Sequence, residues 1–208
     1  IHGVMQAALM EGIGKVYGLD DITTVSTIEL RRMGKPPLAP DTFGCYIDIL
    51  RTSHRTNGPF WEMARDSSYK LITTVAKEMA DASILKPMSW KASREEMKRG
   101  IMKSGMRLDA MGMTSAGRVD LKRDFGPFRV VDTDMLMSMH LLGPGFFAVN
   151  FETEGQLHLM LNYASHAVPD ADMEKVIDHA AKRLRGLATA WACLTPDAVF
   201  YAAASPCI

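Results

Sequence analysis

The stretch from Gly145 to Leu187 constrains the fold more than any other part of this chain. Two runs in which apolar residues occupy every second position flank a Glu-Gly pair, which is typical of antiparallel strands joined by a tight turn. A pattern with helical spacing follows after a short loop. The alternating residues are Phe147, Val149 and Phe151, then Leu157, Leu159, Leu161 and Tyr163; the helical stripe is Met173, Val176, Ile177, Ala180, Leu184 and Leu187. The sequence therefore predicts a β-hairpin followed by an amphipathic helix.

A histidine and an aspartate lie four positions apart in the loop between this hairpin and this helix. His166 is placed to act as a general base, with Asp170 holding the loop in shape. The same two residues also fit a structural role, in which Asp170 caps the helix N-terminus and His166 takes no part in chemistry. The local pattern leaves both interpretations open.

Helices and strands are mixed along the rest of the chain. Apolar spacing predicts helices over 3–17 and 59–80, the second with Trp61 and Ile72 on its buried face, and a more charged helix over 90–103. Strands are predicted where β-branched or alternating residues dominate, over 22–31, 43–50, 108–119 and 128–140. This mixture indicates an α/β fold in which helices pack on a mixed sheet.

Composition excludes several classes of protein. The 208 residues suffice for one large domain or two small ones, and a formal net charge of zero argues against a general nucleic-acid binder. No apolar run approaches the roughly 20 residues that span a bilayer. The three cysteines are far apart, which disfavours a zinc site or a disulfide framework and favours a reduced, cytoplasmic setting. The chain opens in a helical pattern without a targeting segment, as expected for a piece of something longer.

Four motifs and the closing hairpin and helix occur in an order that is known from one superfamily. The motifs are His2–Ile13, Ile28–Pro37 together with Thr42–Gly44, Thr114–Val119, and Asp124–Gly126. In this order they resemble the C-terminal half of the CoA-dependent acyltransferase superfamily. That superfamily includes chloramphenicol acetyltransferase, the plant BAHD acyltransferases, polyketide-associated acyltransferases and the condensation domains of peptide synthetases. The chain departs from the plant DFGWG motif at Pro127 and Phe128.

The resemblance implies a chloramphenicol acetyltransferase-like α/β half, with residues 1–208 as the C-terminal subdomain of a two-half enzyme. The two halves of such enzymes enclose a tunnel, and the catalytic HHxxxDG motif lies in the first half. Its histidine deprotonates a hydroxyl or amine, which attacks the thioester of acyl-CoA or of a phosphopantetheine-bearing acyl-carrier protein. None of the six histidines here lies in such a motif. The chain alone is therefore expected to be inactive without the missing N-terminal half.

The resemblance also implies roles for individual residues. Arg31 falls at the arginine that pairs with the aspartate of the catalytic motif, although an exposed arginine at a strand end is the alternative. Ser115, Gly117 and Asn150 are candidates for lining the tunnel, because small and amide side chains let a pantetheine arm or a tetrahedral oxyanion approach. Ordinary strand residues in a tightly packed sheet are the alternative for these three.

His166 and Asp170 have the HxxxD spacing, but Ser165 stands where the motif has its first histidine and Ala171 where it has glycine. The resemblance implies that they mirror the catalytic loop of the absent half. Two other functions stay open. One is a catalytically degenerate module that binds a carrier protein or another subunit. The other is a small thioester enzyme that uses His166 by itself.

Overall fold

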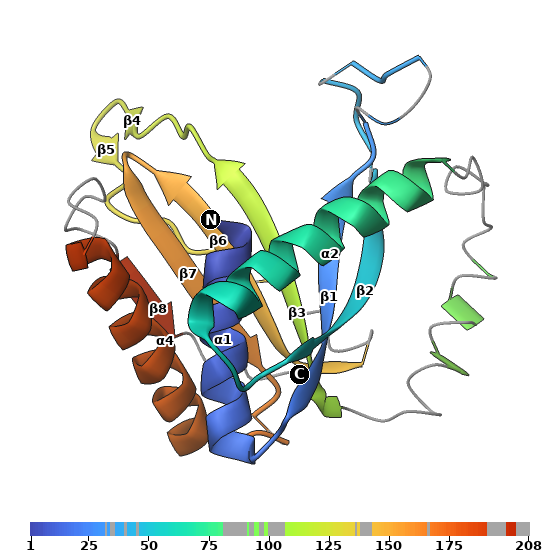
Figure 1. Ribbon diagram of the computed structural model, residues 1–208. Coiled ribbons are helices and arrows are strands. Elements are labelled where there is room, and N and C mark those ends of the chain that lie inside the picture. The colour runs from blue at the N-terminus through green and yellow to red at the C-terminus, as the bar shows by residue number, and fades with distance from the viewer. Residues whose placement is uncertain are drawn as a thin grey trace.

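Figure 1 shows a computed structural model of the chain. The structure describes residues 1–31, 33, 36–39, 41–44, 46–80, 91, 94–95, 98–99, 107–135, 137, 143–165, 167–190 and 199–202. Within these residues, helices α1 (His2–Tyr17), α2 (Phe60–Ala80) and α4 (Asp170–Ala190) accompany the strands of one large sheet and one small hairpin.

The large sheet has the order β2-β1-β3-β6-β7-β8 in the described part of the chain. Its strands are β1 (Asp21–Glu29), β2 (Ile47–Arg55), β3 (Arg107–Arg118), β6 (Pro144–Thr153), β7 (Gln156–Tyr163) and β8 (Val199–Ala202). The three central strands β1, β3 and β6 are parallel, whereas β2 and β7 are antiparallel to β1 and β6. The carboxyl ends of β1, β3 and β6 consequently meet at one edge of the sheet.

The three helices cover one face of this sheet, and α1 lies in the middle of the helical layer (Figure 1). It is buried almost all round from Gly3 to Gly14 because it packs on the sheet and on both other helices. Two glycines allow this close approach. A Cβ on Gly3 would collide with Ser68 and Ala64 of α2, and a Cβ on Gly12 would lie 3.0 Å from the carbonyl oxygen of Val176 in α4.

Alternation along the strands divides the apolar side chains between two cores. The helical side holds most of them, including Leu9, Met111, Phe146 and Leu161. The opposite face holds a smaller cluster of buried residues: Phe147, Val149, Phe151 and Met160. The central strands are thus buried on both faces, as parallel strands usually are.

The sequence-based expectations for α1, α2, α4, β1, β3 and the β6–β7 hairpin are confirmed. The strand predicted over 43–50 is partly wrong, because β2 begins at Ile47 and continues to Arg55, where it pairs with Asp21 of β1. This long antiparallel pairing carries the strand through the polar residues 51–55, beyond the end that local spacing predicted.

The strand predicted over 128–140 is wrong as far as residue 135. Only the two-residue strand β5 (Phe128–Arg129) is present, paired with β4 (Asp124–Phe125), and residues 130–135 have no regular structure. Phe128 is 75% exposed, so the apolar residue that begins this alternating segment does not pack against a core. Most of the helix predicted over 90–103 lies outside the described residues.

The predicted buried face of α2 is also wrong in part. Trp61 and Ile72 are exposed, whereas Met63, Ala64 and Ser67 face the interior. The helix is therefore rotated so that a serine points at α1. In the described part of the chain, no helix is long and apolar enough to cross a membrane.

Candidate functional site

The carboxyl-terminal end of β3 brings together two of the candidate tunnel residues. Ser115 on β3 pairs with Asn150 on β6, and the Asn150 Nδ2 donates hydrogen bonds to the Ser115 Oγ at 2.8 Å and to the Thr114 carbonyl at 3.2 Å. Asn150 is 5% exposed, whereas Ser115 is exposed. A buried amide therefore holds a solvent-facing hydroxyl in place.

A bulge follows immediately along β3. Ser115 pairs with Asn150 and Gly117 pairs with Phe151, so Ala116 is an extra residue in the ladder. Gly117 has a φ of 70°, which a residue with a side chain rarely adopts. The bulge interrupts the ladder directly after the serine, and pairing with β6 resumes at Gly117. Gly117 thus shapes the backbone next to Ser115.

A histidine that sequence reasoning did not single out completes this group. His2, the first residue of α1, lies with its Nδ1 2.9 Å from the Ser115 Oγ. Burial lowers the pKa of His2 below the ordinary value of 6.5 and outweighs a contact with Gln6 that raises it. At neutral pH the ring is therefore uncharged, and the Ser115 hydroxyl is in contact with a neutral imidazole and an amide.

Two further polar side chains lie behind His2. Gln6 is one helical turn along α1, and its Oε1 accepts a hydrogen bond from the Ser67 hydroxyl of α2. Both residues are 1% exposed. His2 and Gln6, four residues apart in the otherwise apolar segment from His2 to Met10, are the signal that the sequence offered for this cluster. The contact with Ser67, 61 residues further along, required the tertiary structure.

Arg31 lies beyond the end of β1, at the same edge of the sheet. Its guanidinium pairs with Glu29 at 2.6 Å, donates to the Gly44 carbonyl at 3.2 Å and lies 5.1 Å from the centre of the Tyr46 ring. The side chain is 27% exposed. The structure thus ties Arg31 to its own loop, and no bond joins it to Ser115 or Asn150 in the described residues.

His166 lies outside the described residues. Asp170 is the first residue of α4, and its Oδ1 accepts a hydrogen bond from the Tyr163 hydroxyl at 2.8 Å. Burial and this carboxylate raise the pKa of Tyr163 to about 12. A negative charge in the first turn of a helix is also stabilising. The observed contacts of Asp170 are those of a residue that joins α4 to β7.

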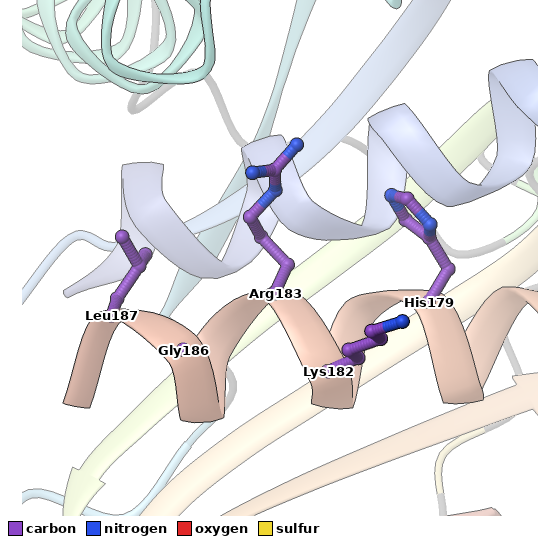
Figure 2. A pocket seen from close by; sticks show the side chains of 5 residues that line it. All are labelled: His179, Lys182, Arg183, Gly186 and Leu187. Atoms are coloured by element: carbon purple, nitrogen blue, oxygen red, sulfur yellow. The ribbon is translucent and has the colours of Figure 1, made fainter. Parts of the chain in front are cut away.

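Another polar cluster lies between α1 and α4, away from Ser115. The Glu11 carboxylate of α1 accepts hydrogen bonds from the Arg183 guanidinium at 2.6 and 2.9 Å and from the Lys15 ammonium at 3.1 Å. The His179 Nε2 lies 3.2 Å from the same carboxylate. Figure 2 shows His179 and Arg183 pointing from α4 toward α1. They line a hollow of about 480 Å³ together with Lys182, Gly186 and Leu187. Because Glu11 already engages both Arg183 and His179, this hollow has the character of a helix–helix junction.

A further polar cluster joins α2 to β2. The His54 Nδ1 lies 2.9 Å from the Asp66 carboxylate and its Nε2 lies 2.7 Å from the Thr52 hydroxyl, which in turn contacts Thr24 at 2.9 Å. His54 is 3% exposed. The order hydroxyl, imidazole, carboxylate also occurs in nucleophilic enzymes. Here it is the buried attachment of a helix to an edge strand.

Comparison with known proteins identifies the fold. No protein family and no curated protein matches the sequence significantly. The crystal structure of the epimerization domain from the third module of tyrocidine synthetase B gives a TM-score of 0.55 at 9% sequence identity, over 91% of this chain and 42% of that chain. The crystal structure of vinorine synthase gives a TM-score of 0.41 at 14% identity, over 73% of this chain and 33% of that chain.

The fold class expected from the sequence is thus confirmed: a mixed sheet with helices packed on it, as in chloramphenicol acetyltransferase-like folds. At this identity the likeness to the epimerization domain concerns the fold alone. This chain spans less than half the length of that domain.

Proposed function

We propose that this chain is the C-terminal half of an acyltransferase that moves an acyl group from a CoA or carrier-protein thioester to a hydroxyl or amine. The acyl donor is a co-substrate, and the catalytic histidine comes from an N-terminal half with an HHxxxDG motif. The fold, and its extent of 42% of the epimerization domain, support a two-half enzyme. A cytoplasmic location belongs to the same proposal.

The observation that carries the proposal is the hydrogen bond from Asn150 to the exposed Ser115 hydroxyl. Attack on a thioester carbonyl places negative charge on its oxygen, and a fixed hydrogen-bond donor stabilises that charge in the transition state. Ser115 is such a donor, Asn150 fixes it, and Gly117 leaves room beside it for a pantetheine arm. In the proposed enzyme these three residues form part of the tunnel wall.

Arg31 has a different role in this proposal. It stays near the end of β1 and pairs with the aspartate of the catalytic motif in the other half, in place of or in addition to Glu29. The partly exposed guanidinium and its position at the same edge of the sheet as Ser115 support this assignment.

The first test is the sequence that precedes Ile1 in the intact protein. We expect an HHxxxDG motif there, and an upstream region without one would overturn the proposal. The second test is acyl transfer by the intact protein with acyl-CoA and with an acyl-carrier thioester as donors. Ser115→Ala should lower kcat roughly 10²–10³-fold, the usual effect of removing one oxyanion donor.

Ser53→Ala is the matched control, because Ser53 is an exposed serine on β2. We expect this variant to transfer acyl groups at the wild-type rate. Binding of an acyl-carrier protein with no transfer from either donor would instead identify a degenerate binding module. Equal activity of Ser115→Ala and Ser53→Ala would remove Ser115 from the site.

A further inference from the structure

Two buried nitrogen atoms near Ser115 have no hydrogen-bond partner among the described residues. They are the Nε2 of His2 and the Nε2 of Gln6. Gln6 is 1% exposed, so bulk solvent does not reach it. Leaving such a group unpaired costs about 1–3 kcal/mol. The two side chains are four residues apart on α1, where helical geometry makes them neighbours. A hydrogen bond between them would satisfy both nitrogens at once.

The contact between Gln6 and Ser67 sets the direction that such a bond would have. The Gln6 Oε1 already accepts from Ser67, so the amide nitrogen of Gln6 is the atom left to face His2. An amide nitrogen only donates, which makes the His2 Nε2 an acceptor without a hydrogen. In a neutral imidazole the hydrogen must then be on Nδ1. His2 therefore donates from Nδ1 to the Ser115 Oγ, 2.9 Å away.

Ser115 now accepts two hydrogen bonds. One comes from His2 and the other from the Asn150 Nδ2 at 2.8 Å. A hydroxyl oxygen has two acceptor positions and one hydrogen. With both acceptor positions filled from the protein side, the hydroxyl hydrogen is left to point to the exposed side of β3.

We infer that Ser67, Gln6 and His2 form a one-directional hydrogen-bond relay that turns the Ser115 hydroxyl hydrogen outward, so that the end of β3 binds a hydrogen-bond acceptor such as a carbonyl oxygen. His2 and Gln6 are positioning residues, since they act through Ser115. The direction of the relay follows from this chain alone. Only the identity of the acceptor, the thioester carbonyl, rests on the proposed function.

The same four side chains also define a relay of the opposite direction. If the Gln6 amide were turned over, its oxygen would accept from the His2 Nε2–H, and this bond would favour the protonated ring and raise the pKa of His2. The His2 Nδ1 would then accept the hydrogen of Ser115 and leave a more nucleophilic oxygen. The two directions place the imidazole hydrogen on different nitrogens. The tautomer of His2 therefore distinguishes an outward donor from an inward one.

The test is ¹⁵N NMR of the intact protein with labelled histidine, at a pH of about 8, where an imidazole of ordinary pKa is neutral. The His2→Gln variant identifies the His2 signals. We expect the shift pattern of an Nδ1–H imidazole in the wild-type protein. An Nε2–H imidazole would overturn the relay.

Substitution of Gln6 should reverse the direction. In Gln6→Glu the carboxylate can only accept, so we expect His2 to become Nε2–H and its pKa to rise. Ser68→Ala is the matched control. Ser68 neighbours Ser67 on α2, but its hydroxyl donates to the Ala64 carbonyl at 3.0 Å within the helix. This variant should keep the wild-type tautomer. A Gln6→Glu protein with an unchanged tautomer and unchanged His2 pKa would contradict the relay.

The effect on catalysis separates the relay from the proposed function. If the protein transfers acyl groups, Gln6→Glu should lower kcat about tenfold or more with little change in KM, because the oxyanion donor is turned inward. A reversed tautomer with unchanged kcat would show that the outward hydrogen is not used. No transfer by any variant, with the wild-type tautomer Nδ1–H, would overturn the proposed function and leave the relay standing.

Discussion

Glu11 is the most strongly perturbed carboxylate in the described structure. Burial raises its pKa, but the hydrogen bonds from Arg183, His179 and Lys15 outweigh this and lower the pKa to about 2. In the unfolded chain the value is that of an ordinary glutamate, 4.5. The folded state therefore gains stability from Glu11 above pH 4.5, and this gain is lost as the pH falls toward 2.

We predict that Glu11→Gln lowers the free energy of unfolding by about 2 kcal/mol at neutral pH, because Arg183 loses a partly buried partner. The difference from the wild type should shrink between pH 4.5 and 2. Urea unfolding at several pH values measures both effects. Glu174→Gln, at an exposed position of α4, should change little. A wild-type–variant difference that is constant with pH would contradict the role of Glu11.

At the scale of elements, α2 is the helix that connects the sheet to the candidate site. Asp66 bonds to His54 of β2, and its neighbour Ser67 bonds to Gln6 of α1. Lys70, one turn later, contacts Asp66 at 2.8 Å and the Ser53 carbonyl at 2.7 Å. One face of α2 thus fixes both the edge strand and the helix that carries His2.

This attachment should weaken in mild acid. Burial lowers the pKa of His54 below 6.5, although Asp66 opposes this and Lys70 supports it. Because its pKa is lower in the folded state, His54 binds a proton more readily in the unfolded state. The stability contributed by His54 is therefore fully present above pH 6.5 and declines as the pH falls below that value. We predict that the wild type loses more stability between about pH 7 and 5 than His54→Gln, which keeps both hydrogen bonds without titrating.

Urea midpoints at the two pH values measure this difference. Equal losses in the two proteins would show that His54 does not titrate on unfolding in this range. His54→Ala should be less stable than His54→Gln by about 1–3 kcal/mol at either pH, because it leaves Thr52 and Asp66 without their shared partner.

At the scale of the whole molecule, Arg31 is the residue whose role depends on the other half. Within this chain it makes a part-exposed pair with Glu29, and such pairs contribute at most about 1 kcal/mol. If it also binds the aspartate of a catalytic motif, its removal leaves a buried charge unpaired at a cost on the order of 3–5 kcal/mol.

We predict that Arg31→Ala in the intact protein severely reduces folding or acyl transfer. Arg107→Ala is the matched control, because Arg107 forms an exposed pair with Asp109 at 2.7 Å, also two residues away. The control should lose less than about 1 kcal/mol. Thermal unfolding and turnover measure both variants. Near-normal turnover of Arg31→Ala would refute the assignment.

The sequence by itself determined the elements whose side-chain period is long and clear. The helix α4 and the β6–β7 hairpin follow from spacing, because burial of one face repeats along a single segment. Spacing also predicted α1 and α2 as helices, but not that α1 is buried almost all round or which face α2 buries. The failures at 130–135 and at the start of β2 have one cause. An alternating pattern becomes a strand only where a neighbouring strand satisfies its backbone, and Phe128 and Val131 instead lie exposed.

The residues of the candidate site also fall into two groups, those that the sequence named and those that only the tertiary structure brought to the site. Resemblance to a superfamily named Ser115, Gly117 and Asn150, and the parallel pairing of β3 with β6 brought the first and last of these together. Only the tertiary structure joined His2, Gln6 and Ser67 to them, since helix packing and the rotation of α2 decide which polar side chains meet. A local pattern specifies which face of an element is apolar, but the partner of a buried polar group comes from a different part of the chain.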